Sequence, residues 1–272
     1  MNELFSIKDG VFALSGGTGA LGGSISEYLV RNGATVLLIG RSDEKLADKK
    51  ASCDAIVKGK TATYKTDVLN ETELRELKNT IKKDFGKLDG LINLAGGNLP
   101  GATQKSEQTI HDLEIEAICK VVDLNLFGTV LPSIILSELM VERGSGSIVN
   151  ISSMAAKQSI SRVLGYSMAK AAVDVFTKWL ANELASSYSN KIRVNAIAPG
   201  FFIGNQNRKL LTNEDGSYTN RGDKIIANTP MKRFGDTSEL NGAVHYLLSE
   251  ASSFVTGSIY DVDGGFSTFS GV

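Results

Sequence analysis

Cysteine and histidine are scarce in this sequence, and their placement argues against two common kinds of site. The 272 residues contain two cysteines and two histidines. Cys53 and Cys119 stand 66 residues apart without CxxC spacing, and neither His111 nor His245 neighbours them, so we expect no structural disulfide and no metal site. Both histidines lie in helix-like segments, where packing or surface exposure is more common than catalysis.

An excess of one charge is also missing. Lys and Arg number 29 against 30 Asp and Glu, so the chain has no overall electrostatic signature for nucleic acid or an anionic membrane. The sequence lacks a basic start followed by an apolar run, and we find no stretch of about 18 apolar residues. These absences favour a small-molecule partner and predict a cytoplasmic protein without nucleic-acid or membrane binding.

Repeats and linkers rich in Pro, Gly and Ser are absent as well, so we expect one domain over residues 1–272. Short β-branched runs alternate with longer helical periodicity, which is typical of βαβ units. Apolar strands such as TVLLIG suit a sheet covered on both faces. The pattern predicts an α/β Rossmann fold with a seven-stranded, doubly wound parallel sheet and helices on both faces. The expected strands are residues 11–16, 35–40, 61–67, 88–96, 146–153, 192–199 and 257–265.

A long polar stretch, residues 204–229, separates the sixth strand from the next helix. A connection of this length usually forms a lid or a binding segment. The alternative is a disordered insertion. Four apolar residues favour short docked helices, and they are Leu210, Leu211, Ile225 and Ile226.

Five glycines lie within LSGGTGALGG, residues 14–23. Gly17, Gly19 and Gly22 match GxGxxG, but a glycine-rich run satisfies that pattern easily, and a structural turn is the alternative. The run follows a strand and precedes a helix-like segment that ends at Gly33, which favours a diphosphate held at a helix N-terminus. The expected contacts are Ser15, Gly16, Thr18, Gly19, Ala20, Leu21 and Gly22.

Arg41 follows the second strand, 19 residues after Gly22, where a basic residue pairs with a 2′-phosphate and an acidic one binds ribose hydroxyls. Ser42, Asp43 and Glu44 are more simply explained as a helix N-cap and an acidic first turn. Arg41 therefore favours NADP(H), with NAD(H) as the alternative. If Arg41 is only a solvated side chain, this preference has no basis.

GYSMAK places Tyr166 and Lys170 one helical turn apart on the same face. A nearby ammonium favours the phenolate, so we expect Lys170 to lower the pKa of Tyr166 and make it an acid/base catalyst. Ser153 ends a strand 13 residues earlier. Its hydroxyl and the phenol can both donate to one carbonyl oxygen.

The chain contains, in this order, the motifs SGGTGALG, DV at Asp67, NLAG at Asn93, DLN at Asn125, NISS, YSMAK, RVNAIAPG and VTGSIYDVDGG. Through these motifs the chain resembles the short-chain dehydrogenase/reductase family nearly end to end. The resemblance implies hydride transfer between a nicotinamide and a carbonyl or alcohol. Tyr166 would be the acid/base, Ser153 would polarise the substrate oxygen, Lys170 would hold the nicotinamide ribose, and Asn125 would position a water in a proton relay.

The resemblance also extends the set of cofactor residues. Asp67 would contact adenine, Asn93 would line the cofactor cleft, and Pro199 and Gly200 would border the nicotinamide. Val68, Ala95, Gly96 and Phe202 complete this set. In the glycine loop, Gly16 and Gly22 match the family's outer glycines, and Ala20 replaces the middle one. A threonine common near Gly204 is missing, so Asn205 would have to take its place.

Within the family, GGNLPGAT, PGFF, NQNRKLLTNEDGS and NTPMKRFG resemble the D-mannonate oxidoreductase (fructuronate reductase) branch. A substrate of this kind carries a carboxylate, and Arg208 is our first candidate to bind it, followed by Arg162, Lys157, Asn98 and Gln206. The alternatives are a gluconate 5-dehydrogenase or another polyol or keto-sugar reductase, and, in a different class, a dinucleotide sensor without catalysis. The intact Asn125, Ser153, Tyr166 and Lys170 argue against the sensor.

The family is commonly tetrameric, and we expect a homotetramer. The apolar tail residues Phe266, Phe269 and Val272 form too short a segment for a core of their own. We therefore expect them to pack against a neighbouring subunit. The alternative is a tail folded back over its own lid.

Overall fold

Parallel strands form the centre of the molecule. The computed structural model describes residues 3–56, 60–105, 107–204 and 208–269. Within these ranges, seven parallel strands form one sheet in the order β3-β2-β1-β4-β5-β6-β7. The strands are β1 Val11–Ser15, β2 Thr35–Gly40, β3 Thr61–Lys65, β4 Gly90–Asn93, β5 Gly146–Ile151, β6 Ile192–Pro199 and β7 Ile259–Val262. The predicted doubly wound sheet is confirmed. β1 lies between β2 and β4, so the strand order reverses there, and such a point is where ligands bind in open α/β sheets.

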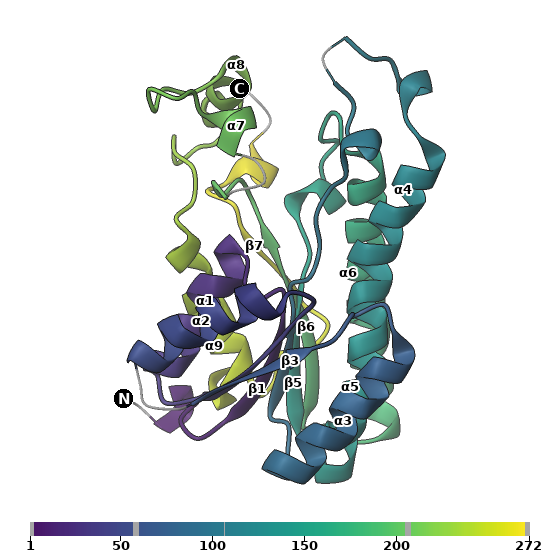
Figure 1. Ribbon diagram of the computed structural model, residues 1–272, viewed down its shortest axis with the longest axis vertical. Coiled ribbons are helices and arrows are strands. Elements are labelled where there is room, and N and C mark those ends of the chain that lie inside the picture. The colour runs from purple at the N-terminus through teal and green to yellow at the C-terminus, as the bar shows by residue number, and fades with distance from the viewer. Residues whose placement is uncertain (1–2, 57–59, 106, 205–207, 270–272) are drawn as a thin grey trace.

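Helices cover both faces of this sheet (Figure 1). On one face lie α1 Ala20–Arg31, α2 Asp43–Ile56 and α9 Asn241–Leu248. The other face carries α3 Glu71–Phe85, α5 Gly128–Arg143 and α6 Leu164–Ser187, and α4 Ile115–Val122 packs beside α6. This two-sided cover explains why every residue of β6 is buried.

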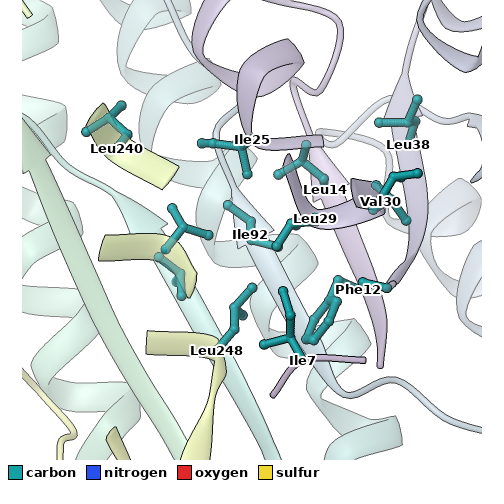
Figure 2. Packing of buried hydrophobic residues seen from close by; sticks show 14 of the residues in the cluster. Ile7, Phe12, Leu14, Ile25, Leu29, Val30, Leu38, Ile92, Leu240 and Leu248 are labelled. Atoms are coloured by element: carbon teal, nitrogen blue, oxygen red, sulfur yellow. The ribbon is translucent and has the colours of Figure 1, made fainter. Parts of the chain in front are cut away.

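The side chains of β1 show how one strand serves both layers. Phe12 and Leu14 belong to the cluster that packs under α1 and α9 (Figure 2), whereas Val11 and Ala13 belong to the cluster under α3, α5 and α6. Successive side chains of a strand point to opposite faces, so an apolar run fills two cores at once. The rigid strand ends that result position the loops that follow them.

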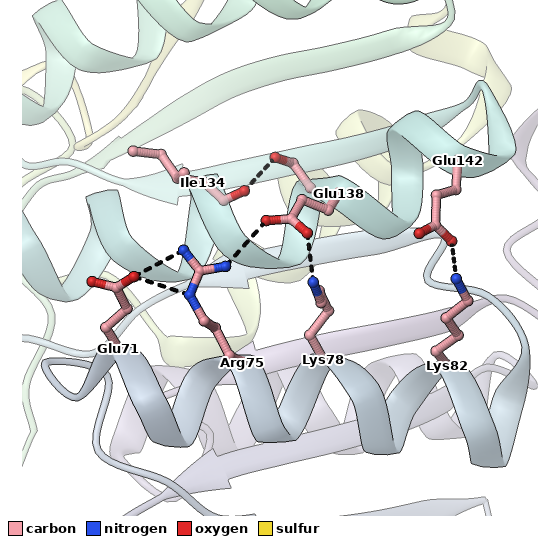
Figure 3. Close-up of polar contacts among 8 residues, drawn as sticks. Glu71, Arg75, Lys78, Lys82, Ile134, Glu138 and Glu142 are labelled. Atoms are coloured by element: carbon pink, nitrogen blue, oxygen red, sulfur yellow. Dashed lines mark hydrogen bonds and ion pairs between the residues drawn. The ribbon is translucent and has the colours of Figure 1, made fainter.

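Charged side chains join α3 to α5 at the surface. Glu138 pairs with Lys78 at 2.5 Å and with Arg75 at 3.6 Å, and Lys82 pairs with Glu142 at 2.8 Å (Figure 3). Exposed pairs of this kind contribute at most about 1 kcal/mol each. They therefore supplement the buried apolar contacts between the two helices.

One helical run, Ile115–Arg143, is long and apolar enough by length and composition to cross a membrane. In the fold this run comprises α4, a π-helical turn at Asp123–Phe127, and α5. Its most apolar window is 56% buried inside the molecule. A single run with this burial is typical of a core helix of a soluble protein.

The long connection after β6 contains α7 Arg208–Leu211 and α8 Asn220–Ala227, which lie beyond the sheet at the top of Figure 1. Leu211 and Ile225 are buried together with Phe234, as expected for docked helices, whereas Leu210 is exposed. The described part of this connection, residues 208–229, is therefore folded and not a disordered insertion.

Candidate active site

The glycine loop after β1 is shaped by close backbone contacts. Gly16 has a φ of +71°, and a Cβ there would lie 2.8 Å from the backbone nitrogen of Ala95. A Cβ on Gly22 would lie 2.3 Å from the carbonyl oxygen of Gly16. Gly16 and Gly22 are thus the positions of the loop where a side chain would collide with backbone, in agreement with the register in which Ala20 replaces the middle glycine.

The loop delivers the chain to the N-terminus of α1. Gly19 is the N-cap residue of α1. Because it has no side chain, it cannot accept hydrogen bonds from the first backbone N–H groups of the helix. A hollow of about 400 Å³ opens beside this end, lined in part by Thr18, Gly19, Ala20 and Lys49. A diphosphate fits this cradle, because N–H groups without a side-chain cap and the helix dipole both favour an anion there.

Ser15 and Asn93 end the two central strands and support the loop. The Ser15 hydroxyl accepts hydrogen bonds from the backbone nitrogens of Leu94 and Ala95, at 3.2 and 3.3 Å. Asn93 is 1% exposed, and its amide donates to Ser133 and Asn150. The Asn93 amide nitrogen therefore ties β4 to α5 and β5, whereas its buried Oδ1 has no partner among the described residues.

The residues that we expect to contact the adenosine part of a dinucleotide follow the ends of β2 and β3. Arg41 follows β2 directly and is exposed, whereas Ser42 accepts a hydrogen bond from the Lys45 nitrogen at 3.3 Å, as a helix cap does. Asp67 accepts from the backbone nitrogen of Leu69 at 3.0 Å, and Val68 is buried. The structure thus places Arg41 and Asp67 beyond the ends of neighbouring strands.

Tyr166 and Lys170 lie on the first turns of α6, one turn apart, with the Lys170 Nζ 5.6 Å from the centre of the Tyr166 ring. Lys170 is 4% exposed, and its Nζ donates to the Ile151 carbonyl oxygen at 2.7 Å. Ser153 follows β5 and hydrogen-bonds Tyr166. The strand tip and the helix therefore bring the predicted hydroxyl, phenol and ammonium together.

The pKa of Tyr166 departs from our expectation. Burial raises the pKa of Tyr166 above its usual value near 10, and the hydrogen bond with Ser153 offsets only part of this. Burial also lowers the pKa of Lys170 to about 8, which the charge of Asp174 partly opposes. The predicted lowering of the Tyr166 pKa by Lys170 is thus wrong for the protein alone, because burial raises this pKa and the Ser153 hydrogen bond is what opposes the rise.

Asn125 sits in the π-helical turn between α4 and α5 and is fully buried. Its Nδ2 donates to the carbonyl oxygens of Gly97 and Val121, both at 2.7 Å, and its Oδ1 accepts from the Gly97 nitrogen at 3.1 Å. A Cβ on Gly96 would lie 2.5 Å from that Oδ1 and 3.7 Å from the Lys170 Nζ. Asn125 therefore fixes the backbone after β4 directly beside Lys170.

The segment after β6 packs against the chain after β7 and reaches the start of α1. Pro199 ends β6, and a Cβ on Gly200 would lie 2.6 Å from the Cα of Asp263. Phe202 is buried and bridges to Gly235, and a Cβ on Gly204 would lie 3.4 Å from that of Ala20. Gly204 thus lies close to the start of α1, whereas Gly200 lies against the segment that follows β7.

The candidate carboxylate-binding residues lie in different surroundings. Lys157 forms an ion pair with Asp261 at 2.5 Å. Asn98 and Arg208 are exposed, and Arg162 is half-buried just before α6. Asn205 and Gln206 lie outside the described residues. Arg162 is therefore the candidate that the fold places near Tyr166 with part of its surface withdrawn from solvent.

The sequence did not predict two charged residues that lie near the site. Asp174 lies one turn beyond Lys170 on α6 and has a buried Oδ1 without a hydrogen-bond partner in the described part of the chain. The i, i+4 spacing of Lys170 and Asp174 could have predicted that the two side chains lie on the same face of the helix. Arg221 lies in the first turn of α8 and donates to the Ser161 hydroxyl at 3.3 Å. No local pattern indicated that contact, since the two residues are 60 positions apart.

The apolar tail packs on its own chain over the described residues. Phe266 stacks edge-on against Phe201 with ring centres 5.3 Å apart, and Lys232 lies 5.8 Å from the ring centre of Phe269. Gln158 donates to the Ser267 carbonyl oxygen at 2.9 Å. This favours the alternative of a tail folded back near its own lid. Val272 lies outside the described residues.

Comparisons with known proteins agree with this geometry. Residues 17–267 match the family model described as Enoyl-(Acyl carrier protein) reductase. The chain is 40% identical to an uncharacterised oxidoreductase of Haemophilus influenzae, covering 98% of this chain and 96% of that protein. It is 33% identical to the 2-dehydro-3-deoxy-D-gluconate 5-dehydrogenase of Formosa agariphila, covering 97% of this chain and 94% of that protein.

Solved structures have the same fold. The crystal structure of a provisionally named D-mannonate oxidoreductase from Haemophilus influenza, with bound NAD, superposes with a TM-score of 0.90 at 38% identity and covers 98% of both chains. The family model, the relatives and the fold agree over nearly the whole length. The chain therefore belongs to the short-chain dehydrogenase/reductase family, whose members are oxidoreductases that act on CH–OH groups.

Proposed function

We propose that this protein is an NAD(P)-dependent oxidoreductase that interconverts a keto and a hydroxy sugar acid, D-fructuronate and D-mannonate. The observation that carries the proposal is the convergence of Ser153, Tyr166 and Lys170 at the tips of β5 and α6. The similarity to the Haemophilus structure supports the substrate.

Each residue of the site would have its own role in the proposed reaction. A bound nicotinamide supplies or accepts the hydride. During reduction, Tyr166 donates its phenolic proton to the substrate oxygen, and Ser153 donates a hydrogen bond to the same oxygen. Lys170 holds the nicotinamide ribose with its ammonium, and Asn125 keeps Gly96 and Gly97 in place and positions a water in the proton relay.

The dinucleotide would lie along the carboxyl edge of the sheet. The N-terminus of α1, which follows the loop shaped by the close contact of Gly16 and Gly22, would hold its diphosphate, and Asp67 would contact its adenine. The segment that starts at Pro199 would border its nicotinamide. The remaining proposed contacts are Ser15, Thr18, Gly19, Ala20, Leu21, Val68, Ala95, Gly96, Gly200 and Phe202.

For the dinucleotide itself we propose NADP(H), because Arg41 follows β2 with an exposed guanidinium that can pair with a 2′-phosphate. The NAD bound in the Haemophilus structure favours NAD(H) as the second candidate. NADP(H) and NAD(H) differ in a single phosphate group, so changing the charge at position 41 tests which dinucleotide the protein prefers.

We further propose a homotetramer. Large apolar side chains form a stripe along α6 at helical spacing, with Met168, Val175 and Trp179 47%, 68% and 60% exposed, and Phe127 and Ile134 are exposed near the start of α5. A patch of this kind usually marks an interface. We propose that this surface of α5 and α6 packs against the same surface of a second subunit, because two-fold interfaces use the same surface on both subunits.

A second substrate remains a candidate. Similarity to the Formosa 5-dehydrogenase favours a gluconate-type sugar acid that is oxidised at carbon 5. Steady-state rates with D-fructuronate, 5-ketogluconate and D-fructose, each with NADH and NADPH, separate the proposals. We expect D-fructuronate with NADPH to have the highest kcat/KM. Faster turnover of 5-ketogluconate would support the second candidate, and dinucleotide binding without turnover of any compound would support a sensor.

A further inference from the structure

Two arginines approach each other across the junction between the lid segment and the body of the protein. Arg221 lies at the start of α8, and its Nη1 donates to the Ser161 hydroxyl at 3.3 Å. Arg162, the next residue after Ser161, precedes α6. Within the described ranges of the chain, neither guanidinium forms an ion pair with an acidic side chain.

Arg162 is held in an unusual conformation. Its φ is +80°, in the left-handed region that non-glycine residues seldom adopt and that persists only where the surroundings impose it. Its Nε donates to the Gln104 carbonyl oxygen at 2.5 Å, and the Gln104 nitrogen donates to the Arg162 carbonyl oxygen at 3.0 Å. This clasp uses only Nε, so Nη1 and Nη2 have no acceptor among the described residues.

The pair is electrostatically unfavourable as it stands. Burial lowers the pKa of Arg221, and the positive charge of Arg162 lowers it further. Two half-buried guanidiniums without a counterion lose hydration and repel each other. A bound anion would remove both penalties, and a carboxylate matches the fork of a guanidinium by accepting two hydrogen bonds.

We propose that Arg162 and Arg221 form a carboxylate subsite that binds the acid group of the sugar-acid substrate. The inference rests on the proposed function and names a residue of that site, Arg221, that neither the sequence pattern nor the relatives assign. Arg162 lies four residues before Tyr166, so the subsite is at the rim of the reacting centre. Because one arginine belongs to the body and the other to α8, a bridging carboxylate would also fasten the lid segment over the substrate.

The test compares sugar acids with neutral compounds that have the same carbon chain. Arg162→Gln and Arg221→Gln remove one guanidinium each, and Lys224→Gln removes an exposed positive charge from the same helix as a matched control. In the presence of NADPH, each arginine variant should raise KM for D-fructuronate about 10- to 100-fold, the loss expected for one charge-assisted hydrogen-bonded contact. KM for D-fructose, the neutral ketose, should change less than about twofold. The Lys224 control should leave both values unchanged.

A binding measurement keeps the subsite separate from turnover. Thermal shift titrations with D-mannonate and D-gluconate, against D-mannitol as the neutral probe, should show stabilisation of the wild type that both glutamine variants lose. Arg221→Lys should recover part of it, since the charge returns without the fork. Melting of each variant without ligand identifies any that fails to fold, in which case the lysine variant carries the test.

The outcomes distinguish this inference from the proposed function. Unchanged KM for D-fructuronate in both arginine variants, or a loss confined to Arg208→Gln, would overturn the subsite while the activity stands. Stabilisation by sugar acids that depends on both arginines, without turnover of any of them, would support the subsite and overturn the proposed function. A wild type that reduces D-fructose and is stabilised by no sugar acid would overturn both.

Discussion

Gly16 and Gly22 meet backbone to backbone, so closely that a Cβ on Gly22 would lie 2.3 Å from the Gly16 carbonyl oxygen. This contact folds the loop back on itself and delivers the chain into α1 with its first N–H groups open. The diphosphate cradle therefore depends on the absence of one side chain, at a residue inside a helix where glycine is otherwise unfavourable.

Gly22→Ala should damage both folding and dinucleotide binding. The added methyl group must push the loop away from the helix, so we expect a loss of about 1–3 kcal/mol of stability and at least a tenfold weaker dinucleotide affinity. Thermal melting and a fluorescence titration with NADPH measure the two effects. Gly242→Ala in α9 is the matched control, because a Cβ there meets nothing within 4 Å. Wild-type affinity in Gly22→Ala would show that the contact does not shape the cradle.

Lys170→Met should abolish activity and yet stabilise the protein below pH 8. Burial lowers the pKa of Lys170 from its usual 10.5 to about 8, so the unfolded chain binds more protons between these values. The free energy of unfolding of the wild type should then rise with pH from about 8 to 10.5. Removing the buried charge relieves its penalty but leaves the Ile151 carbonyl oxygen unpaired, for a net gain of about 1–2 kcal/mol.

Denaturant melts of both proteins from pH 6 to 10.5 check this effect. The stability difference should be largest at neutral pH and vanish near the upper end of the range. A Lys170→Met protein that is less stable than the wild type at pH 7 would mean that the ammonium contributes more to the fold through its hydrogen bond than burial costs it.

Arg41→Asp should reverse the dinucleotide preference. A carboxylate repels the 2′-phosphate and can bind the ribose hydroxyls instead, so the ratio of kcat/KM for NADPH over NADH should fall at least tenfold. Lys45→Ala removes an exposed charge one helical turn away and should leave the ratio unchanged. An equal ratio in Arg41→Asp and wild type would show that the guanidinium is only solvated.

Trp179→Glu should dissociate the assembly. The side chain is 60% exposed on the apolar stripe of α6, and a carboxylate buried there between two copies would lack a partner. Light scattering after size exclusion should give a tetramer mass for the wild type and for Trp179→Phe, and a smaller species for the glutamate variant. A monomeric wild type would contradict the proposed assembly.

The strands could be predicted closely where both of their faces are buried. Thr35–Gly40 and Ile192–Pro199 have the predicted bounds, because their apolar runs end where the sheet ends. The strand predicted over residues 88–96 is shorter, Gly90–Asn93, since Leu94 to Gly96 turn away from the sheet toward Asn125. Turns that are formed by distant contacts leave little trace in the local pattern.

The site was predictable in its residues and less so in its electrostatics. The spacing of Tyr166 and Lys170 placed them on one helix face, but their burial depends on α4 and on the strand tips, so the direction of the Tyr166 pKa followed only from the fold. Arg221 could not be paired with Arg162 from the sequence, because the connection after β6 brings them together across 58 intervening positions.

The central claim is that Tyr166 transfers a proton during hydride transfer to a keto sugar acid. The most direct measurement is the rate of NADPH oxidation with saturating D-fructuronate in the wild type and in Tyr166→Phe, together with NADPH affinity by fluorescence. Our account predicts wild-type turnover that falls about 10²- to 10⁴-fold in the variant, the range of a lost general acid, with NADPH affinity changed less than about twofold. Equal turnover in the two proteins would contradict it.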